Sequence, residues 1–426
     1  MKPSGIDWIG DIPKSWKVTR LQTLFDQVKD KNSGTKEKNL LSLSYGKIVK
    51  KDIEGAFGLI PESFDTYNII KKNDIVLRLT DMQNDQVSLR TGLVKEEKGI
   101  ITSAYVTIRL KCGSPSYYHW YLYAFDTSKQ IYAFGQGVRQ SLTFEELKKM
   151  LILLPSPKEQ QAIADFLDEE CAQIDSIAAD LEKQIVLLQQ YKKSLITETV
   201  TKGLDKSAPM KDSGVEWIGK IPEHWQKTRI KFEASIIGSG TTPDSGNSMY
   251  YDNGEHSWIQ SGDLYGKDYI YETEKQLTNL AILECHALNW YTKDFVVVAM
   301  YGASVGNVAI SKIDSFTNQA CCVIKLNEKN DNRYLFYFLK AAQEEMLLKA
   351  FGGTQPNISQ IIIKNLNFLN VPLLEQIEIA DFLDSKCDMI NEMLKSKKDQ
   401  YDILIKHKKS LIYEYVTGKK RVKEVQ

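Results

Sequence analysis

Several polar loops of this sequence combine glycine with arginine, glutamine and asparagine, the side chains best suited to hydrogen bonding with the edges of DNA bases. The segment 135–141 holds Arg139 and Gln140 between glycines and a serine. In the major groove, arginine makes paired hydrogen bonds to guanine, and glutamine makes a similar pair with adenine. Glycine lets such a loop approach a ligand closely because it carries no side chain. The chemistry predicted for this loop is therefore base recognition.

Similar loops occur in both halves of the chain, and together they define a predicted DNA-contacting set. The segment 80–85 follows an expected strand in the first half, and the loops of the second half are 240–243, 260–263 and 352–357. Nearby lysines are suited to phosphate contacts, which position a protein on DNA without reading sequence. The predicted DNA-binding residues are Lys47, Arg78, Thr80, Gln83, Asn84, Gly137, Arg139, Gln140, Ser141, Thr241, Thr242, Gln260, Asp263, Gly353, Thr354, Gln355 and Asn357.

Two plainer interpretations of these residues stay open. Any single polar residue of the set also suits ordinary turn chemistry, because Gly, Asn, Asp and Ser are the usual turn formers. The lysines Lys47, Lys50 and Lys51 equally suit a solvated charged surface. The set as a whole therefore carries more weight than any one member.

Motifs for catalysis or cofactor binding are missing from the sequence. It contains no G-x-x-x-x-G-K-[ST] phosphate loop, no H-E-x-x-H zinc motif and no Asn/Asp-Pro-Pro-aromatic signature of an amino-methylating enzyme. The six cysteines form no C-x-x-C pair, and Glu284, Cys285 and His286 are adjacent residues, which rarely converge on one metal. We therefore expect no catalytic residue, no metal site and no cofactor in this chain.

A self-repeat organises the chain. The segment 5–16, GIDWIGDIPKSW, recurs at 214–225 as GVEWIGKIPEHW, an offset of 209 residues. A second repeat, Glu-Gln followed by Ile-Ala-Asp-Phe-Leu-Asp, begins at Glu159 and at Glu375, an offset of 216, so the second copy is seven residues longer. The ends of the two copies match closely, while the loops between them differ. One frame with two sets of loops predicts two related bodies with different binding surfaces.

Each copy is expected to hold a mixed globular part followed by a long helix. Apolar runs at 74–79, 104–110 and 295–300 predict strands. After Pro157 and Pro372, apolar residues recur every seven positions, which predicts two helices that pair as a coiled coil. The heptad residues are Leu167, Ile174, Leu181, Leu188 and Leu195, then Leu383, Ile390, Leu404 and Leu411, with Lys397 interrupting the second seam. The alternative is that each helix packs only on its own globular part.

Composition and charge distinguish the two halves. Of 426 residues, 42% are hydrophobic, and no apolar run suits a signal peptide or a membrane span, so we expect a cytoplasmic protein with no membrane partner. The formal net charge is zero, yet residues 1–155 hold 23 Lys and Arg against 17 Asp and Glu, a net +6. Residues 206–371 hold 16 against 18, a net −2. Phosphate contacts in the second globular part must therefore come from a local patch.

These features predict an α+β chain with two mixed α/β target-recognition domains separated by two long helices. The predicted boundaries are 1–155 and 206–371 for the recognition domains, and 156–205 and 372–426 for the spacer helices. The helices are expected to form an antiparallel coiled coil, which relates the two copies by a pseudo-two-fold axis. A helix from Lys158 to Thr201 would be about 65 Å long, or roughly 19 base pairs. Such a ruler suits two half-sites with an unread gap between them.

The repeated motifs resemble those of the specificity subunits of type I restriction–modification systems, over essentially the whole chain. They comprise the segment 8–16 with its repeat at Trp217, the Pro157 segment with its repeat at Pro372, and the segments 192–196 and 352–358. The resemblance implies that each recognition domain reads one half of a bipartite double-stranded DNA target, and that helix length sets the gap. It also implies two adenine-methylating modification subunits, which use S-adenosylmethionine, and restriction subunits that use ATP and Mg for translocation.

The two halves are not equivalent in charge, length or loop sequence, so we expect an asymmetric target. Two other functions stay open at this point: a coiled-coil scaffold without sequence-specific DNA binding, and a stand-alone DNA-modifying enzyme. A scaffold would not need two large bodies with different loops. An enzyme would need a catalytic motif that the sequence lacks.

Overall fold

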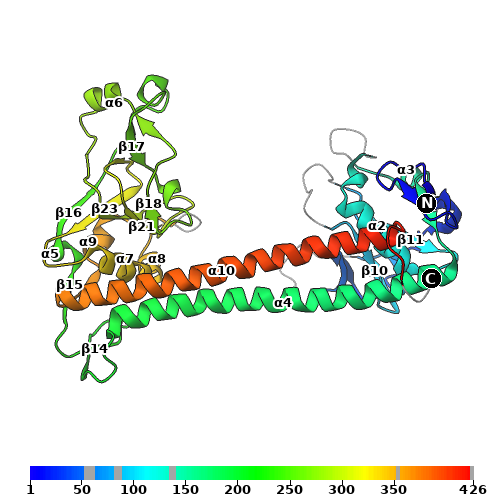
Figure 1. The fold of residues 1–426 in the computed structure, drawn as a ribbon, viewed down its shortest axis with the longest axis horizontal. Helices are drawn as coiled ribbons and strands as arrows, with labels where there is room; N and C mark the ends of the chain where they lie inside the picture. The colour runs from blue at the N-terminus through cyan, green and yellow to red at the C-terminus, as the bar shows by residue number, and fades with distance from the viewer. Residues whose placement is uncertain (52–62, 81–88, 134–140, 352–355, 423–426) are drawn as a thin grey trace. The chain divides into compact units, whose positions relative to one another are not determined.

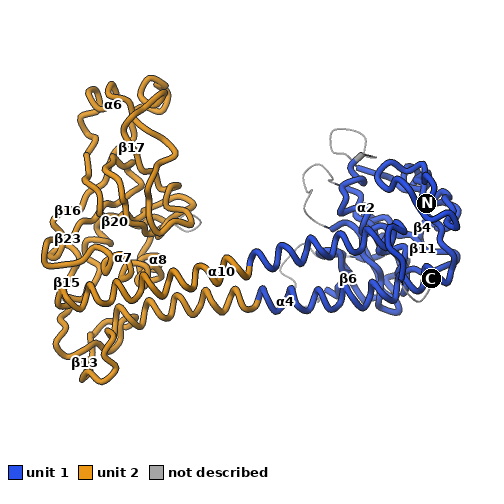
Figure 2. The backbone as a smooth tube through the Cα atoms, viewed as in Figure 1, with its two compact units in different colours: residues 1–182, 398–426 blue, residues 183–397 orange. Residues whose placement is uncertain are grey.

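The chain forms two compact units, each built from one globular part and half of each long helix. The computed structural model describes residues 1–51, 63–80, 89–133, 141–351 and 356–422. Unit 1 consists of residues 1–182 and 398–426, and unit 2 of residues 183–397 (Figure 2). The globular part of unit 1, from β1 to β12, is here named body 1, and that of unit 2, from β13 to β24, is named body 2 (Figure 1).

Body 1 is built on a four-stranded antiparallel sheet with the strand order β4-β11-β8-β9. Its smaller sheets pair β1 with β2, β3 with β12, β5 with β6, and β7 with β10. The strands are β1 Lys2–Pro3, β2 Asp11–Ile12, β3 Lys17–Arg20, β4 Phe25–Gln27, β5 Leu41–Ser44, β6 Lys47–Lys50, β7 Asn68–Lys71, β8 Ile75–Leu77, β9 Thr91–Leu93, β10 Lys98–Ile101, β11 Val106–Leu110 and β12 Leu151–Leu154. The helices are α1 Leu21–Leu24, α2 Pro115–Thr127, the 3-10 turn η1 Gln130–Ala133 and α3 Phe144–Leu147.

Body 2 is built on a five-stranded sheet with the order β16-β23-β20-β21-β18, in which β18 and β21 run parallel. A second sheet, β19-β17-β22, lies with α6 at the end of body 2 away from the long helices (Figure 1). The strands are β13 Met210–Asp212, β14 Lys220–Pro222, β15 Gln226–Arg229, β16 Ala234–Ser239, β17 His256–Ile259, β18 Tyr269–Ile270, β19 Gln276–Leu277, β20 Phe295–Ala299, β21 Val308–Ser311, β22 Phe316–Thr317, β23 Cys321–Leu326 and β24 Asn367–Asn370. The helices are α5 Ile230–Glu233, η2 Ser248–Tyr250, η3 Ser261–Leu264, α6 Asn279–Glu284, α7 Asn332–Ala341, α8 Gln343–Leu348 and α9 Gln360–Lys364.

The duplication seen in the sequence is confirmed by the strand order. The order β4-β11-β8-β9 in body 1 corresponds to β16-β23-β20-β21 in body 2, and the pair β3-β12 corresponds to β15-β24. The predicted strands at 74–79, 104–110 and 295–300 are β8, β11 and β20. Body 2 adds β18 as a fifth strand and the sheet β19-β17-β22. The frame is therefore shared, and the additions to it differ.

The two long helices are α4 Pro157–Lys202 and α10 Leu373–Val416. Three side-chain contacts within unit 1 join Phe166 to Tyr415, Asp175 to Lys408 and Glu182 to Tyr401. The partner number on α10 falls as the number on α4 rises, so the helices run antiparallel. This confirms the predicted antiparallel pairing of the long helices, and the repeated strand order confirms the internal duplication.

The heptad residues form the predicted seam, but they are buried unequally. Leu167, Ile174 and Leu181 are buried on α4, and Leu383, Ile390 and Leu411 are buried on α10. Leu188, Leu195 and Leu404 are only half-buried. Leu167, Ile174 and Leu411 belong to the hydrophobic core of body 1 and Leu383 to that of body 2, where apolar side chains of α2 or α7 are members of the same cores.

Each body is fastened to the end of a long helix by a buried tyrosine at an equivalent position. The hydroxyl of Tyr117 in α2 donates to the carbonyl of Val416 at 3.0 Å, and the hydroxyl of Tyr334 in α7 donates to the carbonyl of Val200 at 3.0 Å. Val200 and Val416 are themselves 216 residues apart, which is the offset of the helix repeat. The four predicted domain boundaries stay a prediction, since each compact unit combines one body with parts of both helices.

Candidate nucleic-acid interface

In both bodies, a residue that follows the predicted recognition loop in the sequence makes the same backbone contact just beyond the central strand. In body 1, the N–H of Leu142 donates to the carbonyl of Leu79 at 2.9 Å, just beyond β8. In body 2, the N–H of Ile358 donates to the carbonyl of Met300 at 2.7 Å, just beyond β20. Leu142 and Ile358 are 216 residues apart. Leu142 and Ile358, which follow the predicted loops in the sequence, therefore occupy equivalent places in the two bodies.

This contact brings three of the predicted residues of body 1 together. Arg78 and Thr80 flank Leu79, and Ser141 precedes Leu142 and is exposed. The backbone N–H of Arg78 donates to the carbonyl of Arg90 at 2.8 Å, so the segment continues the pairing of β8 with β9. The predicted residues Gln83, Asn84, Gly137, Arg139 and Gln140 lie outside the described residues.

A buried arginine that the sequence analysis did not predict as a site residue supports the backbone of Arg78 and Thr80. The guanidinium of Arg90 donates from Nη1 to the carbonyls of Thr80 at 2.8 Å and Arg78 at 3.2 Å, and from Nε to the hydroxyl of Tyr132 at 3.2 Å. Its backbone N–H donates to the buried carboxylate of Asp126 at 2.6 Å. The Arg90 side chain is fully buried, so it positions the loop and presents no surface to a ligand. Arg90 ends a polar loop in the sequence, and nothing there distinguishes it from an exposed arginine.

Lys47 lies apart from Arg78 and Thr80. It begins β6 after a two-residue turn in which Tyr45 and Gly46 both have positive φ, the geometry that joins the strands of a tight hairpin. Its ammonium lies 3.8 Å from Oδ2 of Asp175 on α4, and its side chain is 72% exposed. Lys47 thus faces the long helix, and no hydrogen bond or ion pair described in the structure joins it to Arg78, Thr80 or Ser141.

In body 2, the loop 240–243 passes close to the segment that follows β22. A Cβ on Gly240 would lie 1.6 Å from the carbonyl oxygen of Thr317, so only glycine fits there. The hydroxyl of Thr242 donates to the amide oxygen of Gln319. Thr241 and Thr242 are half-buried, and Gln319 is exposed. Gln319 therefore joins the candidate surface, although it lies 77 residues from Thr242 and no sequence pattern connects them.

Gln260 and Asp263 take different roles in the same turn. The carboxylate of Asp263 is buried and accepts from the N–H groups of Gln260 at 2.8 Å and Glu274 at 3.1 Å. Asp263 therefore holds the turn, and a direct contact with DNA stays a prediction. Gln260 and Thr242 line one cleft of about 680 Å³, whose wall includes the buried ring of Trp258. The structure thus brings two of the predicted residues of body 2 to a common surface.

Asn357 closes the last predicted loop. It forms a backbone bridge with Phe351, with N–H···O distances of 2.8 and 3.0 Å, and it is exposed. Gly353, Thr354 and Gln355 lie outside the described residues. Met300, whose carbonyl receives the N–H of Ile358, donates its own N–H to the carbonyl of Ala320 at 2.7 Å. Through Met300, the residue after Asn357 is therefore connected with Ala320, the residue after Gln319.

Comparison with known proteins identifies a family to which both halves of the chain are similar. The family described as "Type I restriction modification DNA specificity domain" matches residues 13–186 and 222–400, once over each half of the chain. The chain belongs to this family. The two matched ranges repeat the duplication, and each joins a body to the start of its following long helix.

Relatives of the family match almost the full length. The MjaVIII type I restriction enzyme specificity subunit of Methanocaldococcus jannaschii is 24% identical over 427 residues, which cover 97% of this chain and 95% of that protein. The HsdS subunit from Thermoanaerobacter tengcongensis has a TM-score of 0.52 at 14% identity, covering 96% of this chain and 98% of that one. A chain from a structure on complex assembly and conformational transition of the type I R-M system has a TM-score of 0.72 at 14% identity, covering 95% and 98%. These two structures establish a shared fold.

Two further features of the described residues bear on alternative sites. No helix among them is long and apolar enough to cross a membrane. In the same part of the chain, no group of three or more His, Cys, Asp and Glu side chains is placed to hold a metal ion. The buried thiol of Cys171 has its pKa raised to about 12, mainly by burial, which suits a packed side chain of the α4 seam better than a nucleophile.

Proposed function

We propose that this chain is the DNA-reading specificity subunit of a type I restriction–modification complex. Body 1 reads one half-site of a bipartite target and body 2 reads the other. The two half-sites differ in sequence, so the target is asymmetric. The helices α4 and α10 set the length of the unread gap between them.

One observation carries this proposal. The residues that follow the predicted recognition loops make the same backbone contact in both bodies, Leu142 to Leu79 and Ile358 to Met300, while the loop sequences differ. A shared frame with divergent loops is the arrangement expected of a protein that reads two different sequences at a fixed separation. Membership of a DNA specificity family supports the same conclusion.

We propose a set of residues at the DNA surface of each body. In body 1 they are Arg78, Thr80 and Ser141 with the loop residues Gln83, Asn84, Gly137, Arg139 and Gln140. In body 2 they are Thr241, Thr242, Gln260 and Asn357 with Gly353, Thr354 and Gln355, and we add Gln319. Lys47 is suited to a phosphate near the helix pair, and Asp263 to positioning Gln260.

The partners in the complex are modification subunits and restriction subunits. The long helices carry exposed apolar side chains at positions related by the repeat offset of 216. Ile177 on α4 is 52% exposed, and its equivalent Met393 on α10 is 50% exposed. Leu187 is 53% exposed, and its equivalent Ile403 is 65% exposed. Apolar residues that are kept outside the helix seam in both copies suit the docking of two copies of one partner.

Catalysis is proposed to belong to those partners. S-adenosylmethionine would bind the modification subunits, and ATP and Mg would bind the restriction subunits, so this chain would contribute recognition and geometry alone. A coiled-coil scaffold without DNA reading is less well supported, because it gives no reason for two bodies with different loops. A stand-alone DNA-modifying enzyme is less well supported because the sequence lacks its motif.

Methylome sequencing tests the proposal. The full chain is co-expressed with its modification subunit in a host without other adenine methylation, and methylated positions are mapped on the genome. We expect N6-methyladenine within a split motif with a fixed gap. Methylation confined to short continuous sites, or its persistence when this chain is omitted, contradicts the proposal.

A double variant of this chain tests whether body 1 reads only one of the two half-sites. Replacing Arg139 and Gln140 by alanine removes the strongest base-reading donors predicted for body 1. Selectivity for one half-site should relax, while the other half-site stays unchanged in the same methylome. An equal loss at both half-sites would indicate that these residues act through structure or general charge.

A further inference from the structure

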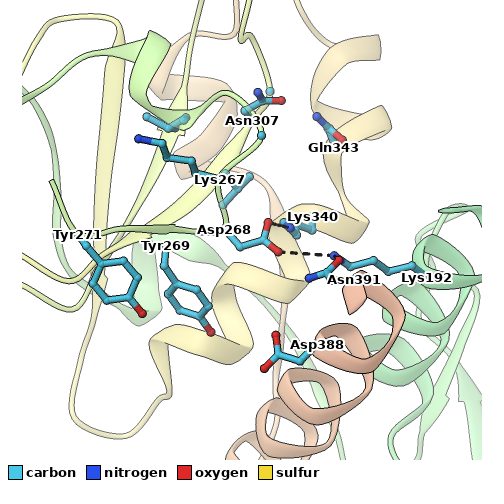
Figure 3. Close-up of a pocket in the computed structure, with 14 residues that line it drawn as sticks. Lys192, Lys267, Asp268, Tyr269, Tyr271, Asn307, Lys340, Gln343, Asp388 and Asn391 are labelled. Atoms are coloured by element: carbon cyan, nitrogen blue, oxygen red, sulfur yellow. Dashed lines mark hydrogen bonds and ion pairs between the residues drawn. The ribbon is translucent and has the colours of Figure 1, made fainter. Parts of the chain in front are cut away.

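A carboxylate of body 2 bridges two lysines that come from different elements of unit 2. Asp268, directly before β18, receives a hydrogen bond from Lys340 of α7, and its Oδ2 lies 3.6 Å from the ammonium of Lys192 on α4. Figure 3 draws the Asp268 side chain between these two lysines, in a cavity of about 600 Å³. Lys192 also donates to the amide oxygen of Asn391 on α10 at 2.9 Å. Through Lys192, Asp268 is therefore connected to both long helices.

The next residue makes a second connection to α10. The hydroxyl of Tyr269 donates to Oδ1 of Asp384 at 3.0 Å. The same carboxylate accepts from the hydroxyl of Tyr337 at 2.7 Å and from Nη1 of Arg333 at 3.0 Å. Asp381, one turn earlier on α10, also accepts from Arg333, at 2.7 Å. Two adjacent residues of body 2 thus contact α4 and α10 through two linked networks.

The first network is only partly open to solvent. The side chains of Asp268, Lys340 and Lys192 are 33%, 23% and 17% exposed. Burial opposes the ionisation of Asp268, yet Lys340 and Lys192 hold its pKa below the usual range. The same burial lowers the pKa of Lys340, and Asp268 counteracts it. Ion pairs shielded in this way have more effect on geometry than exposed ones, which salt and water weaken.

Body 1 is fastened differently at the equivalent place. Asp168, which is 216 residues before Asp384, accepts from the indole N–H of Trp120 and the hydroxyl of Ser116, each at 2.7 Å. Both donors are uncharged. Among the described residues of body 1, the four-stranded sheet ends at β9 and no strand takes the place of β18. Unit 1 has a counterpart of the lysine bridge, because Lys408 pairs with Asp175, which also lies 3.8 Å from the ammonium of Lys47 in body 1. What distinguishes unit 2 is that Asp268 and Tyr269, at the start of β18, make the connection from its fifth strand.

We propose that Asp268 and Tyr269 are positioning residues that fix body 2 on the helix pair and thereby restrict the gap length that the complex accepts. The inference rests on the proposed function and adds residues that set spacing without touching DNA. One extra base pair displaces a half-site by about 3.4 Å and rotates it by about 35° around the DNA axis. A body held at two linked networks resists such a movement, and a body with one network removed tolerates it.

The test measures gap selectivity in the assembled complex. Asp268→Asn keeps the shape of the side chain and removes its charge, and Lys192→Gln removes the same bridge from the helix side. Each full-length variant is co-expressed with the modification subunit, and the methylome is scored at the native gap and at gaps one base pair longer and shorter. We expect both variants to raise relative methylation at the altered gaps by about fivefold to tenfold, with unchanged half-site sequences.

Glu345→Gln is the matched control, because Glu345 pairs with Lys349 inside body 2 at 2.5 Å without reaching α4 or α10. It should leave gap selectivity unchanged. Unchanged gap selectivity in both Asp268→Asn and Lys192→Gln overturns the inference, as does equal relaxation in Glu345→Gln. Methylation lost at every gap together with a lower melting temperature indicates a purely structural role and also overturns it. A wild-type complex that methylates no split motif overturns the proposed function itself, and the inference with it.

Discussion

The indole N–H of Trp16 donates to Oε1 of Glu159 at 3.0 Å, and this contact ties the entry motif of body 1 to the first turn of α4. Trp225 makes the same contact to Oε2 of Glu375 at 2.9 Å, at the start of α10. Both indoles are almost fully buried. Burial opposes the ionisation of Glu159, but its hydrogen bonds from Trp16 and Ser156 outweigh that effect and lower its pKa. In each copy, the tryptophan of the entry motif therefore contacts the glutamate at the start of the following long helix, and this contact occurs once in each unit.

Removing the indole donor should destabilise both units alike. Trp16→Phe and Trp225→Phe each remove a donor from a partly exposed carboxylate, at a cost of about 1 kcal/mol in addition to the lost ring volume. Urea denaturation of the full chain, followed by hydrogen exchange of α4 and α10, reports the loss in each unit. We expect comparable losses, with increased exchange at the start of α4 in the first variant and of α10 in the second. A variant as stable as the wild type would argue against a stabilising role for this contact.

Acid should destabilise unit 1 through a buried histidine of α2. Burial lowers the pKa of His119 to about 4, and Lys95 and Lys408 contribute to the shift. The folded imidazole thus stays neutral while the unfolded one, with an ordinary pKa near 6.5, takes up a proton. Stability is complete above pH 6.5 and falls as the pH drops towards 4, by about 2 kcal/mol between pH 7 and pH 5. Denaturation of wild type and His119→Phe at pH 7, 6 and 5 measures it, and the same decline in both would exclude His119 as its source.

The frame of this fold was predictable because it depends on local and repeated signals. Heptad spacing after Pro157 and Pro372 predicts α4 and α10, and continuous apolar runs predict β8 and β20. Heptad spacing did not predict how deeply each residue of the seam is buried. Leu188 and Leu404 are half-buried, since heptad spacing gives the face of a residue but not how much of the rest of the protein covers it.

The site was only partly predictable because its contacts join residues far apart in the sequence. Thr242 belongs to a recognisable polar loop, but its partner Gln319 does not. Asp263 has the residue type of a ligand-contacting side chain and is instead buried on backbone N–H groups. Asp268 and Lys192 are of residue types that are common on a solvated surface. Their pairing follows from where β18 and α4 lie in the fold, which residue types alone do not specify.

Arg90 should be required for selectivity at the half-site that body 1 reads, although its side chain does not contact DNA. Arg90→Met removes the donors to the carbonyls of Arg78 and Thr80, and leaving those acceptors unpaired should cost about 2–3 kcal/mol. Because Arg90 supports only body 1, methylome sequencing should find the first half-site degenerate and the second intact. Stability is measured in parallel by urea denaturation. Equal degeneracy at both half-sites, or none despite the lost stability, would contradict this role.

The exposed apolar residues of the long helices should be required for assembly and not for folding. Ile177→Asp combined with Ile403→Asp places two charges on the unit 1 surface that we propose for partner docking. Because both side chains are more than half exposed, the free chain should lose less than about 0.5 kcal/mol per substitution. Binding of the modification subunit should weaken by about 100-fold or more, since a desolvated charge at an apolar interface has no partner.

Gel filtration of the co-expressed proteins and titration by calorimetry measure that binding. Gln184→Asp is the control, because Gln184 is an exposed polar residue one heptad after Ile177 on the same helix. It adds a charge at the equivalent heptad position without removing an apolar side chain, so it should bind nearly as the wild type does. If the double variant binds as tightly as the control, the partner docks elsewhere, and the repeated exposure of Ile177, Leu187, Met393 and Ile403 needs another explanation.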